Sequence, residues 1–377
     1  MARPFYLVGH NTNSIQEIRD GLASGLNAFE IDVNRDANDQ LFVAHDFVEQ
    51  PSIRAPNIRP PQLDVFLSEL RQLALSREGA GMALLIIDSK VRAPALGAKI
   101  ARSVRANLTD NSRLLPVIYS VAKVADAQTF FGPIHDTLAS NEGLMIDEEP
   151  DPAQASHFFQ GLGVRRGCWG NGVTTIAGIG LPTPNLPVQM DAGVAIRAVG
   201  NLRFVYPWVL REPSTIAEFV RIGVNGVMVD TGQAAGLVGV LRRPEFAAHV
   251  RSATRADDPF ADDRSPLLQI QTADVAHAGT DARITFTLEL DGGRTIKKSV
   301  DAAFNGRFER GSLNFVLLQN DAFSIAEVRA VTVVHDGSGN APDWELATIT
   351  LRRRGEQDRI AAFHRVVSAN SAARVQL

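Results

Sequence analysis

The sequence is poor in cysteine, has no long apolar run and carries no surplus of positive charge. Among its 377 residues Cys168 is the only cysteine, so no internal disulfide can form and the fold must depend on its core. Acidic residues outnumber basic ones by 42 to 38, and the net charge of −4 gives no support to a nucleic-acid-binding protein. No apolar run approaches the roughly 18 residues of a membrane span. Hydrophobic residues at 45% and charged residues at 21% are ordinary globular usage, which excludes a disordered chain, a collagen and a coiled coil.

The first residues show no signal peptide. The segment 1–4 leads directly into the apolar run Phe5–Val8, without a basic segment, a long apolar segment and a small-residue cleavage site. Two interpretations stay open: a cytoplasmic protein, or the mature or engineered form of a secreted one.

The first 265 residues alternate short apolar runs with longer amphipathic stretches. The runs expected to form strands are Phe5–Val8, Ala28–Val33, Leu41–Ala44, Leu84–Ile87, Leu115–Ser120, Gly143–Ile146, Val164–Cys168, Phe204–Val209 and Gly226–Val229. The stretches expected to form helices include Ser14–Ser24, Gln62–Ser76, Ala95–Asn107, Val121–Phe131, Pro152–Gly161 and Thr215–Ile222. Apolar strands separated by helices predict a parallel sheet covered on both faces. Their number favours a TIM (β/α)8 barrel over an open sheet, since no glycine-rich phosphate loop follows an early strand.

The composition changes near residue 255. The stretch 255–266 is polar, acidic and proline-containing, and after it short strand-like alternations replace the helical spacing. Residues 267–351 therefore predict an all-β sandwich of about a hundred residues. The expected organisation is a barrel domain over 1–260, a linker over 261–266, the sandwich over 267–351, and a C-terminal tail over 352–377 that folds back as a helix or stays loose.

Ionisable residues end several of the expected strands, which is where barrels place catalytic groups. His10 ends the first strand. Glu30 and Asp32 lie two residues apart, so both face one side of the second strand. Asp88 and Lys90 have the same spacing after the run that begins at Leu84. A structural role is the ordinary explanation for one such residue, but four such strand ends within 90 residues favour a functional site.

A second histidine, His45, follows the run that begins at Leu41. The chain leaves Asp32 through a turn-rich segment over 34–39. The chain runs about six residues away from Asp32 to the turn and about seven residues back from it. This returns His45 to the level of Asp32, so we expect the two residues side by side.

Three carboxylates without cysteine favour Mg²⁺ or Ca²⁺ over zinc. Two histidines beside such a site suit phosphoryl chemistry: one attacks or deprotonates, and the other protonates the leaving oxygen. Which histidine has which role stays open. The metal would neutralise charge on the phosphate, and Lys90 would add a second positive contact.

The motifs Gly9-His10-Asn11, Phe29-Glu30-Ile-Asp32-Val, Val43-Ala-His45-Asp46 and Ile87-Asp88-Ser-Lys90 resemble the glycerophosphodiester phosphodiesterase superfamily. The sphingomyelinase D / phospholipase D group of venoms, bacteria and fungi is the closer match. Asp88 stands where glycerophosphodiesterases usually have Glu, and only 37 residues separate Asp46 from Leu84, too few for their usual insertion domain. Ser252-Ala-Thr254-Arg-Ala-Asp257-Asp258-Pro259-Phe260 resembles the segment that closes the barrel in that group.

The resemblance implies a role for each matching position. It makes His10 and His45 the catalytic pair and Lys90 a phosphate contact. It makes Glu30, Asp32 and Asp88 the Mg²⁺ ligands. Trp208, in Tyr206-Pro-Trp208, matches a tryptophan that lines the headgroup pocket, where an aromatic face can hold a quaternary ammonium; the alternative is a packed rim aromatic.

Asp230 stands where the group often has Asn. Two departures from the group's pattern lie near the headgroup. Arg211 stands where the group usually has Asp. The segment 46–61 lacks the cysteines that close a loop in the venom enzymes. These changes put headgroup choice in doubt more than phosphoryl chemistry.

The C-terminal region resembles a PLAT/LH2 domain, the β-sandwich attached to lipoxygenases and many lipases. The motifs are Ala278-Gly-Thr280-Asp281-Ala, Phe308-Glu-Arg-Gly311 and the segment from His335 to Trp344. Such domains dock enzymes to lipid surfaces or protein partners, and some bind Ca²⁺, here through Asp281 and its neighbours. Trp344 either inserts at an interface or packs in the sandwich core.

Together the two resemblances imply a secreted, monomeric, Mg²⁺-dependent phospholipase D-type phosphodiesterase that docks on lipid. Its substrates would be choline- or ethanolamine-bearing phospholipids, lysophospholipids or sphingomyelin. Attack by the lipid's own hydroxyl would give a cyclic phosphate, and attack by water would give direct hydrolysis. The alternatives are a glycerophosphodiesterase for soluble, deacylated headgroups and a lipid-binding protein with an inactive barrel.

Overall fold

The structure is a computed structural model that describes residues 2–45, 60–91, 93–109, 114–172, 174–176, 179–181, 186–301, 307–319, 323–339 and 343–377. Its contacts divide the chain into two compact units. The first comprises residues 1–183 and 201–261, and the second comprises 184–200 and 262–377. Among the described residues, no helix combines the length and the apolar character needed to cross a bilayer.

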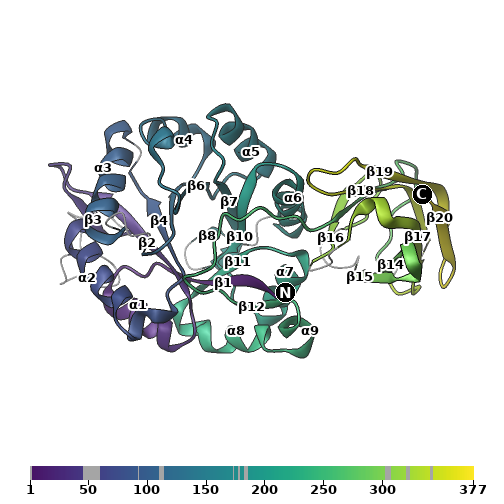
Figure 1. Ribbon diagram of the computed structural model, residues 1–377, viewed down its shortest axis with the longest axis horizontal. Helices are drawn as coiled ribbons and strands as arrows, with labels where there is room; N and C mark the ends of the chain where they lie inside the picture. The colour runs from purple at the N-terminus through teal and green to yellow at the C-terminus, as the bar shows by residue number, and fades with distance from the viewer. Residues whose placement is uncertain are drawn as a thin grey trace. The chain divides into compact units, whose positions relative to one another are not determined.

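Parallel strands form the centre of the first unit (Figure 1). In sheet order they are β10 (Leu202–Trp208), β7 (Gly167–Gly172), β6 (Glu142–Ile146), β5 (Val117–Val121), β4 (Leu84–Ser89), β2 (Ala28–Arg35), β1 (Arg3–His10) and β11 (Gly226–Asp230). The two ends of this series meet, since Asn225 N donates to Val205 O at 2.8 Å and Leu210 N donates to Met228 O at 2.9 Å. The predicted (β/α)8 barrel is confirmed.

Helices surround these strands (Figure 1). They are α1 (Ile15–Ala23), α2 (Leu63–Leu75), α3 (Pro94–Val104), α4 (Val124–Phe131), α5 (Pro152–Gly161), α7 (Pro213–Ile222), α8 (Ala234–Leu241) and α9 (Pro244–Ala247). Local sequence stabilises the start of α1. The Ser14 hydroxyl caps the helix by accepting a hydrogen bond from Glu17 N, and Glu17 places negative charge in the first turn. The almost uniformly apolar α8 has no polar face, so its sequence gives no helical periodicity to predict from.

The segment after α9 closes the amino-terminal end of the barrel. The short strand β12 (Val250–Ser252) pairs with β1, and Asn27 Nδ2 donates to Ser252 Oγ at 2.9 Å and to Ala253 O at 3.1 Å. Arg255 donates from Nη2 to Ala74 O and Gly79 O, each at 2.8 Å. Phe260 is buried in the same cluster as Tyr6 and Ile118. These contacts give residues 252–260 the closing role that their resemblance implied.

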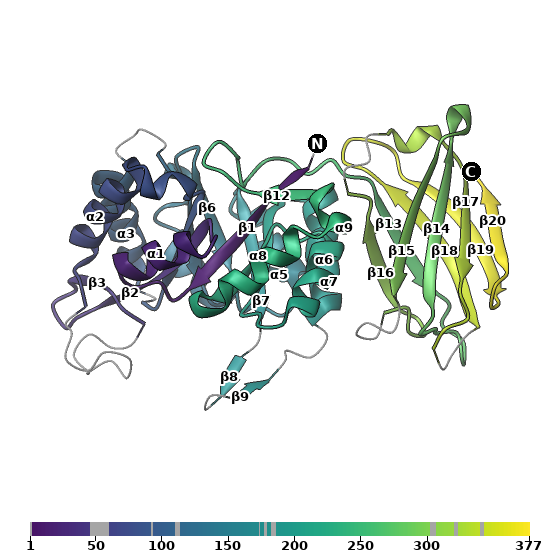
Figure 2. The same ribbon diagram turned by 90° about the horizontal axis from the view of Figure 1, so that it is seen from below.

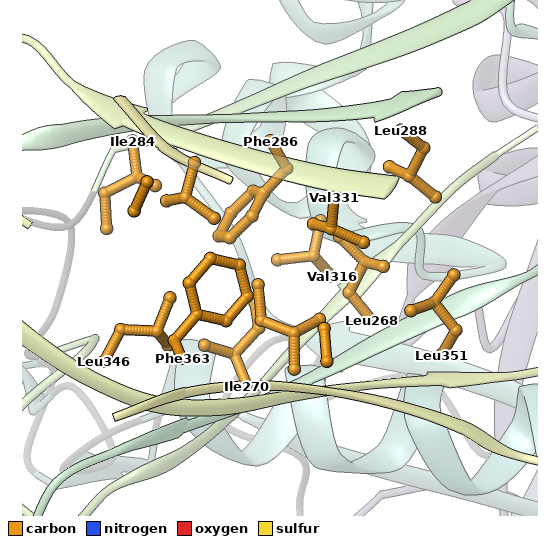
Figure 3. Close-up of a cluster of buried hydrophobic side chains, with 14 of the residues drawn as sticks. Leu268, Ile270, Ile284, Phe286, Leu288, Val316, Val331, Leu346, Leu351 and Phe363 are labelled. Carbon is orange, nitrogen blue, oxygen red and sulfur yellow. The ribbon is translucent and has the colours of Figure 1, made fainter. Parts of the chain in front are cut away.

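The second unit contains two antiparallel sheets (Figure 2). One consists of β16 (Leu313–Leu317), β13 (Leu267–Thr272), β18 (Trp344–Arg352) and β19 (Arg359–Val367). The other consists of β15 (Thr295–Asp301), β14 (Arg283–Leu290), β17 (Val328–His335) and β20 (Ala372–Gln376). Alternate residues of each sheet face a shared core, as Ile284 and Phe286 do opposite Ile270 and Phe363 (Figure 3).

Trp344 belongs to this core. Its side chain is fully buried, its ring meets Phe308 edge-on at 5.2 Å between centroids, and its Nε1 donates to Thr272 Oγ1 at 3.1 Å. An indole held in this way cannot insert into a lipid interface, so that alternative for Trp344 is wrong.

The expectation of a loose or helical tail over 352–377 is also wrong. β19 pairs with β18, and β20 pairs with β17, so this segment supplies one strand to each sheet. Exposed residues interrupt the apolar alternation of β19 and β20, so these two segments show no strand pattern in the sequence. The same holds for β15, which is mostly polar. The sheets, rather than local pattern, determine these strands.

The second unit also includes α6 (Leu186–Val199), which lies between β7 and β10 in the chain. Within this unit, Asp191 of α6 accepts two hydrogen bonds from Arg307, Nε to Oδ2 and Nη2 to Oδ1, each at 2.7 Å. Burial raises the pKa of Asp191 to about 6, although the guanidinium acts to lower it. The contacts therefore divide the chain differently from the sequence boundary at residue 260.

Candidate active site

Three carboxylates gather where β2 and β4 end. Asp32 and Asp88 are direct neighbours in the parallel register of β2 and β4, and Glu30 lies two residues before Asp32 on the same face. One oxygen from each carboxylate lies within 4.8 Å of the others, so the group can hold a metal ion. Glu30 and Asp32 are only 3% and 1% exposed, which leaves little water to screen their repulsion.

The electrostatics of the group follow from this burial. Burial raises the pKa of Glu30 well above its usual range, and repulsion from Asp32 and Asp88 raises it further. Burial also raises the pKa of Asp88, even though Lys90 acts to lower it. For Asp32, burial acts upward, but Lys90 and the Asn13 amide hold its pKa below the usual range. Without a bound ion, the ionised carboxylates therefore destabilise one another.

Lys90 is the cation within this group. Its Nζ lies 2.9 Å from Asp32 Oδ1 and also contacts Asp88 Oδ2. Burial acts to lower the pKa of Lys90, but the surrounding carboxylates raise it well above its usual range. One ammonium beside three ionised carboxylates leaves two negative charges, which matches the charge and the oxygen preference of Mg²⁺ or Ca²⁺.

Two asparagines after β1 hold the carboxylates in place. Asn11 N donates to Glu30 Oε2. Asn13 Nδ2 donates to Asp32 Oδ2, and Asp32 N donates to Asn13 Oδ1, each at 2.8 Å. The backbone of Asn11 is in the left-handed region with a φ of 54°, which asparagine tolerates better than most residues. The sequence reasoning missed both residues, although the run from His10 to Asn13 directly follows a strand that carries a candidate catalytic group.

His10 ends β1 beside the last residue of β11. In the parallel register His10 is the direct neighbour of Asp230, and its Nδ1 lies 3.1 Å from Asp230 Oδ1. The His10 side chain is 29% exposed, so it is accessible from the open end of the barrel. Asp230 is a site residue that the sequence reasoning recorded only as a departure from the family.

His45 reaches the same end of the barrel by a hairpin. The short strand β3 (Leu41–Val43) runs antiparallel to β2, and Ala44 N donates to Asp32 O at 2.9 Å. His45 is therefore one residue past the level of Asp32, close to where the sequence places it. It is exposed, and its charge is among the influences that lower the pKa of Asp32. Asp46 and residues 47–59 lie outside the described residues.

Trp208 ends β10 and is half-buried. Its indole Nε1 donates to Asp147 O at 2.7 Å, which fixes the ring at the end of β6. Burial raises the pKa of Asp147 well above its usual range, and the charge of Asp88 adds to this. The same end of the barrel thus carries a further buried acid that the sequence reasoning did not select.

The described residues of the second unit contain no comparable metal site. Within the described ranges, Glu30, Asp32 and Asp88 form the only group of three or more His, Cys, Asp or Glu residues close enough to share an ion. The expected Ca²⁺ site near Asp281 therefore gains no support from the described part of the sandwich.

Comparison with known proteins agrees with this architecture. The family model described as "Dermonecrotic toxin SPH" matches residues 1–260, and the PLAT/LH2 domain model matches 267–365. A dermonecrotic toxin SPH of Ixodes scapularis is 25% identical over 68% of this chain and 76% of its own length. A dermonecrotic toxin of Sicarius terrosus is 24% identical over 68% of this chain and 98% of its own length. A solved glycerophosphodiester phosphodiesterase from Parabacteroides distasonis is more distant, at 14% identity over 63% of this chain and 98% of that one, with a TM-score of 0.42.

Proposed function

Because the chain belongs to the dermonecrotic toxin SPH family, whose members are sphingomyelinase D phosphodiesterases, we propose that it removes the headgroup from lipids that carry choline or ethanolamine. The chain is an enzyme of the class that cleaves phosphoric diesters. The proposed substrates are sphingomyelin, phospholipids and lysophospholipids. The observation that supports this proposal is a buried group of three carboxylates with one lysine, with His10 at the end of β1 and His45 next to the residue that pairs with Asp32.

Glu30, Asp32 and Asp88 would hold one Mg²⁺. The fit rests on the donor set, which is all oxygen, and on the two negative charges that Lys90 leaves unbalanced. When bound, the ion would neutralise charge on the phosphate. Asn11 and Asn13 would keep the carboxylates oriented through the hydrogen bonds described above.

The side chains of this chain would perform the remaining steps. An ammonium has three N–H donors, and two of those of Lys90 are directed to Asp32 and Asp88, so one is left for a phosphate oxygen. One of His10 and His45 would act as base or nucleophile, and the other would protonate the oxygen of the departing headgroup as its bond to phosphorus breaks. If the lipid's own hydroxyl forms the new bond to phosphorus, the product is a cyclic phosphate; if water forms it, the product is a phosphomonoester. The half-buried ring of Trp208 would form one wall of the ammonium pocket.

The sandwich would hold the enzyme at lipid. PLAT domains are lipid- or membrane-associated, and the toxin family is secreted, so we propose an extracellular lipid surface as the partner. Exposed large apolar side chains on the described part of this unit are Val275, Leu313, Ile360 and Val366. The net charge of −4 makes attraction to anionic lipid a poor main force, so apolar contact should dominate. We propose that the enzyme acts as a monomer.

A substrate panel tests the proposal. Chelator-treated enzyme, with and without added Mg²⁺, is assayed on sphingomyelin, lysophosphatidylcholine and glycerophosphocholine, and ³¹P NMR identifies the phosphorus product. We expect turnover of the two lipids only with the metal, and the product spectrum distinguishes a cyclic phosphate from a monoester. Turnover of glycerophosphocholine alone would make the protein a glycerophosphodiesterase. No turnover of any substrate would favour an inactive, lipid-binding barrel.

A further inference from the structure

An arginine with unused hydrogen-bond donors lies at the end of the barrel that carries the metal-binding group. Arg211 comes three residues after the end of β10, and its side chain is 51% exposed. Its closest ion-pair contact joins Nε to Asp230 Oδ2 at 3.6 Å, which is beyond hydrogen-bond distance. A guanidinium has five N–H donors, and none of those of Arg211 makes a hydrogen bond within the described residues. Arg211 can therefore bind an anion without breaking a hydrogen bond to these residues.

The backbone holds Arg211 at this end of the barrel. The preceding residue, Leu210, is buried, and its N donates to Met228 O, two residues before the end of β11. Asp230 ends β11 and is the direct neighbour of His10, which ends β1. Arg211 thus lies where the carboxyl ends of β10, β11 and β1 come together. Because Nε is its nitrogen nearest to Asp230, the edge formed by Nη1 and Nη2 is left for a ligand.

The other groups at this end that would contact a headgroup differ from Arg211 in kind. The three carboxylates and Lys90 lie at the ends of β2 and β4, where a metal ion and the ammonium would take the phosphate. Trp208, at the end of β10, has an aromatic ring that is held by the hydrogen bond from its Nε1 to Asp147 O. Such a ring attracts an ammonium, and a guanidinium pairs with a carboxylate. This end of the barrel therefore combines contacts for a phosphate, an ammonium and a carboxylate.

We infer that Arg211 selects a headgroup that carries a carboxylate as well as an ammonium, as a serine headgroup does. The inference rests on the proposed phosphodiesterase function and names the headgroup that the site prefers. A choline or ethanolamine headgroup carries only a cation, so it gives Arg211 nothing to bind and places a second positive charge near it. A serine headgroup adds one carboxylate, which a planar guanidinium can bind through two parallel N–H···O bonds. Asp230 weakens this attraction without removing it, since it lies 3.6 Å away and accepts no hydrogen bond from Arg211.

Two lysophospholipids with the same acyl chain test the inference in the full chain with Mg²⁺, because serine differs from ethanolamine only by the carboxylate. For the starting enzyme, kcat/KM on micelle-dispersed lysophosphatidylserine should exceed that on lysophosphatidylethanolamine about tenfold. Arg211→Gln should bring this ratio to about one and change kcat/KM on the ethanolamine lipid by less than about twofold. Arg211→Lys keeps the charge without the two parallel bonds and should retain a preference of about threefold. Arg221→Gln, a change at a 45% exposed arginine near the end of α7, is the matched control with an unchanged ratio.

Two kinetic outcomes would overturn the inference. Equal losses on both lipids in Arg211→Gln would show that this side chain binds the phosphate, which the two substrates share. An active starting enzyme with a ratio of about one would show that Arg211 does not distinguish the headgroups.

A binding measurement keeps the inference separate from the proposed function. Isothermal titration calorimetry with Mg²⁺ compares O-phosphoserine with O-phosphoethanolamine, which reproduce the two headgroups without a lipid. The starting protein should bind O-phosphoserine about tenfold more tightly, and Arg211→Gln should bind the two probes equally. A protein that shows this difference but turns over no lipid would overturn the proposed function alone. Equal binding of the two probes, or no binding of either, in a protein without the kinetic preference would overturn the inference.

Discussion

The two units of this chain differ in the surroundings of their buried ionisable groups. In the sandwich, His335 is fully buried, its Nε2 shares a hydrogen bond with Val367 O at 2.6 Å, and its Nδ1 accepts from Gly337 N. In the barrel, Glu30, Asp32 and Asp88 are crowded together with one lysine between them. Buried groups are normally satisfied by partners. The barrel group also has partners, in Asn11, Asn13 and Lys90, but its three acids still repel one another, and this is the unit in which we propose the chemistry.

The largest effect should come from the histidines of the barrel. His10→Ala or His45→Ala should each reduce kcat at least about a hundredfold, the usual scale for a positioned proton-transfer group. Steady-state kinetics on lysophosphatidylcholine measure this, and His364→Ala, an exposed histidine of β19, is the control from the other unit. Near-normal rates in both barrel variants would remove them from the mechanism.

Replacing Asp88, a proposed metal ligand, should leave the stability of the metal-free protein intact and weaken its stabilisation by Mg²⁺. Asp88→Asn relieves repulsion, so the metal-free variant should melt at the same temperature as the starting protein or higher. Mg²⁺ at about 100 times its Kd should stabilise the starting protein by about 2.7 kcal/mol and the variant far less, with activity reduced in parallel. Differential scanning fluorimetry after chelation measures this. Full activity in chelator-treated starting enzyme would contradict a metal-dependent site.

The pH dependence of the metal-free protein follows from Glu30. Burial raises the pKa of this group in the folded state, so above its unfolded value of about 4.3 the folded state binds a proton that the unfolded chain has released. Its stabilising contribution is complete below that value and is lost as pH rises through the raised pKa. The melting temperature without metal should therefore fall as pH rises through this window, and the increment from Mg²⁺ should grow. A metal increment that is constant across pH would show that Glu30 is not a ligand.

In the second unit, the sensitive point is the buried ion pair. Arg307→Ala leaves Asp191 buried without its guanidinium and should cost about 3 kcal/mol of stability. Adding Asp191→Ala should recover part of this loss, because the unpaired charge is then gone. Denaturant unfolding of the three variants measures both effects. A chain that ends near Ser265 would lose Arg307 and leave Asp191 without this partner, so its properties would reflect the broken ion pair as well as the missing sandwich strands.

The smallest effect concerns docking. Replacing Ile360 and Val366, which are 63% and 51% exposed on β19, by serine should weaken vesicle binding about threefold and leave the rate on micelle-dispersed substrate unchanged. Leu75→Ser, at 64% exposure on α2, is the matched barrel control. Vesicle sedimentation with and without Ca²⁺ measures both variants. Equal sedimentation of all forms would give the sandwich another purpose, such as binding a protein.

The site residues that could be predicted from the sequence are those that lie at the end of an apolar run. His10, Glu30, Asp32 and Asp88 each end or nearly end an apolar run, and the barrel then brings strand ends together. Asp230 ends its run in the same way, but its significance depends on the neighbour of β1, which no local pattern contains. Asn13 depends on a loop conformation, and β19 and β20 depend on sheets formed by distant strands. Tertiary contacts therefore account for most of what the sequence missed.

The position of β1 in the sheet determines how late in synthesis of the chain the site can assemble. The strand that carries His10 leaves the ribosome before the other barrel strands, yet it lies between β2 and β11, and β11 begins only at Gly226. One edge of β1 must therefore wait for most of the barrel to be synthesised before it gains its neighbour. Until then His10 has no Asp230 beside it, so a nascent or truncated chain lacks the assembled site. The topology delays activity until synthesis of the barrel is nearly complete.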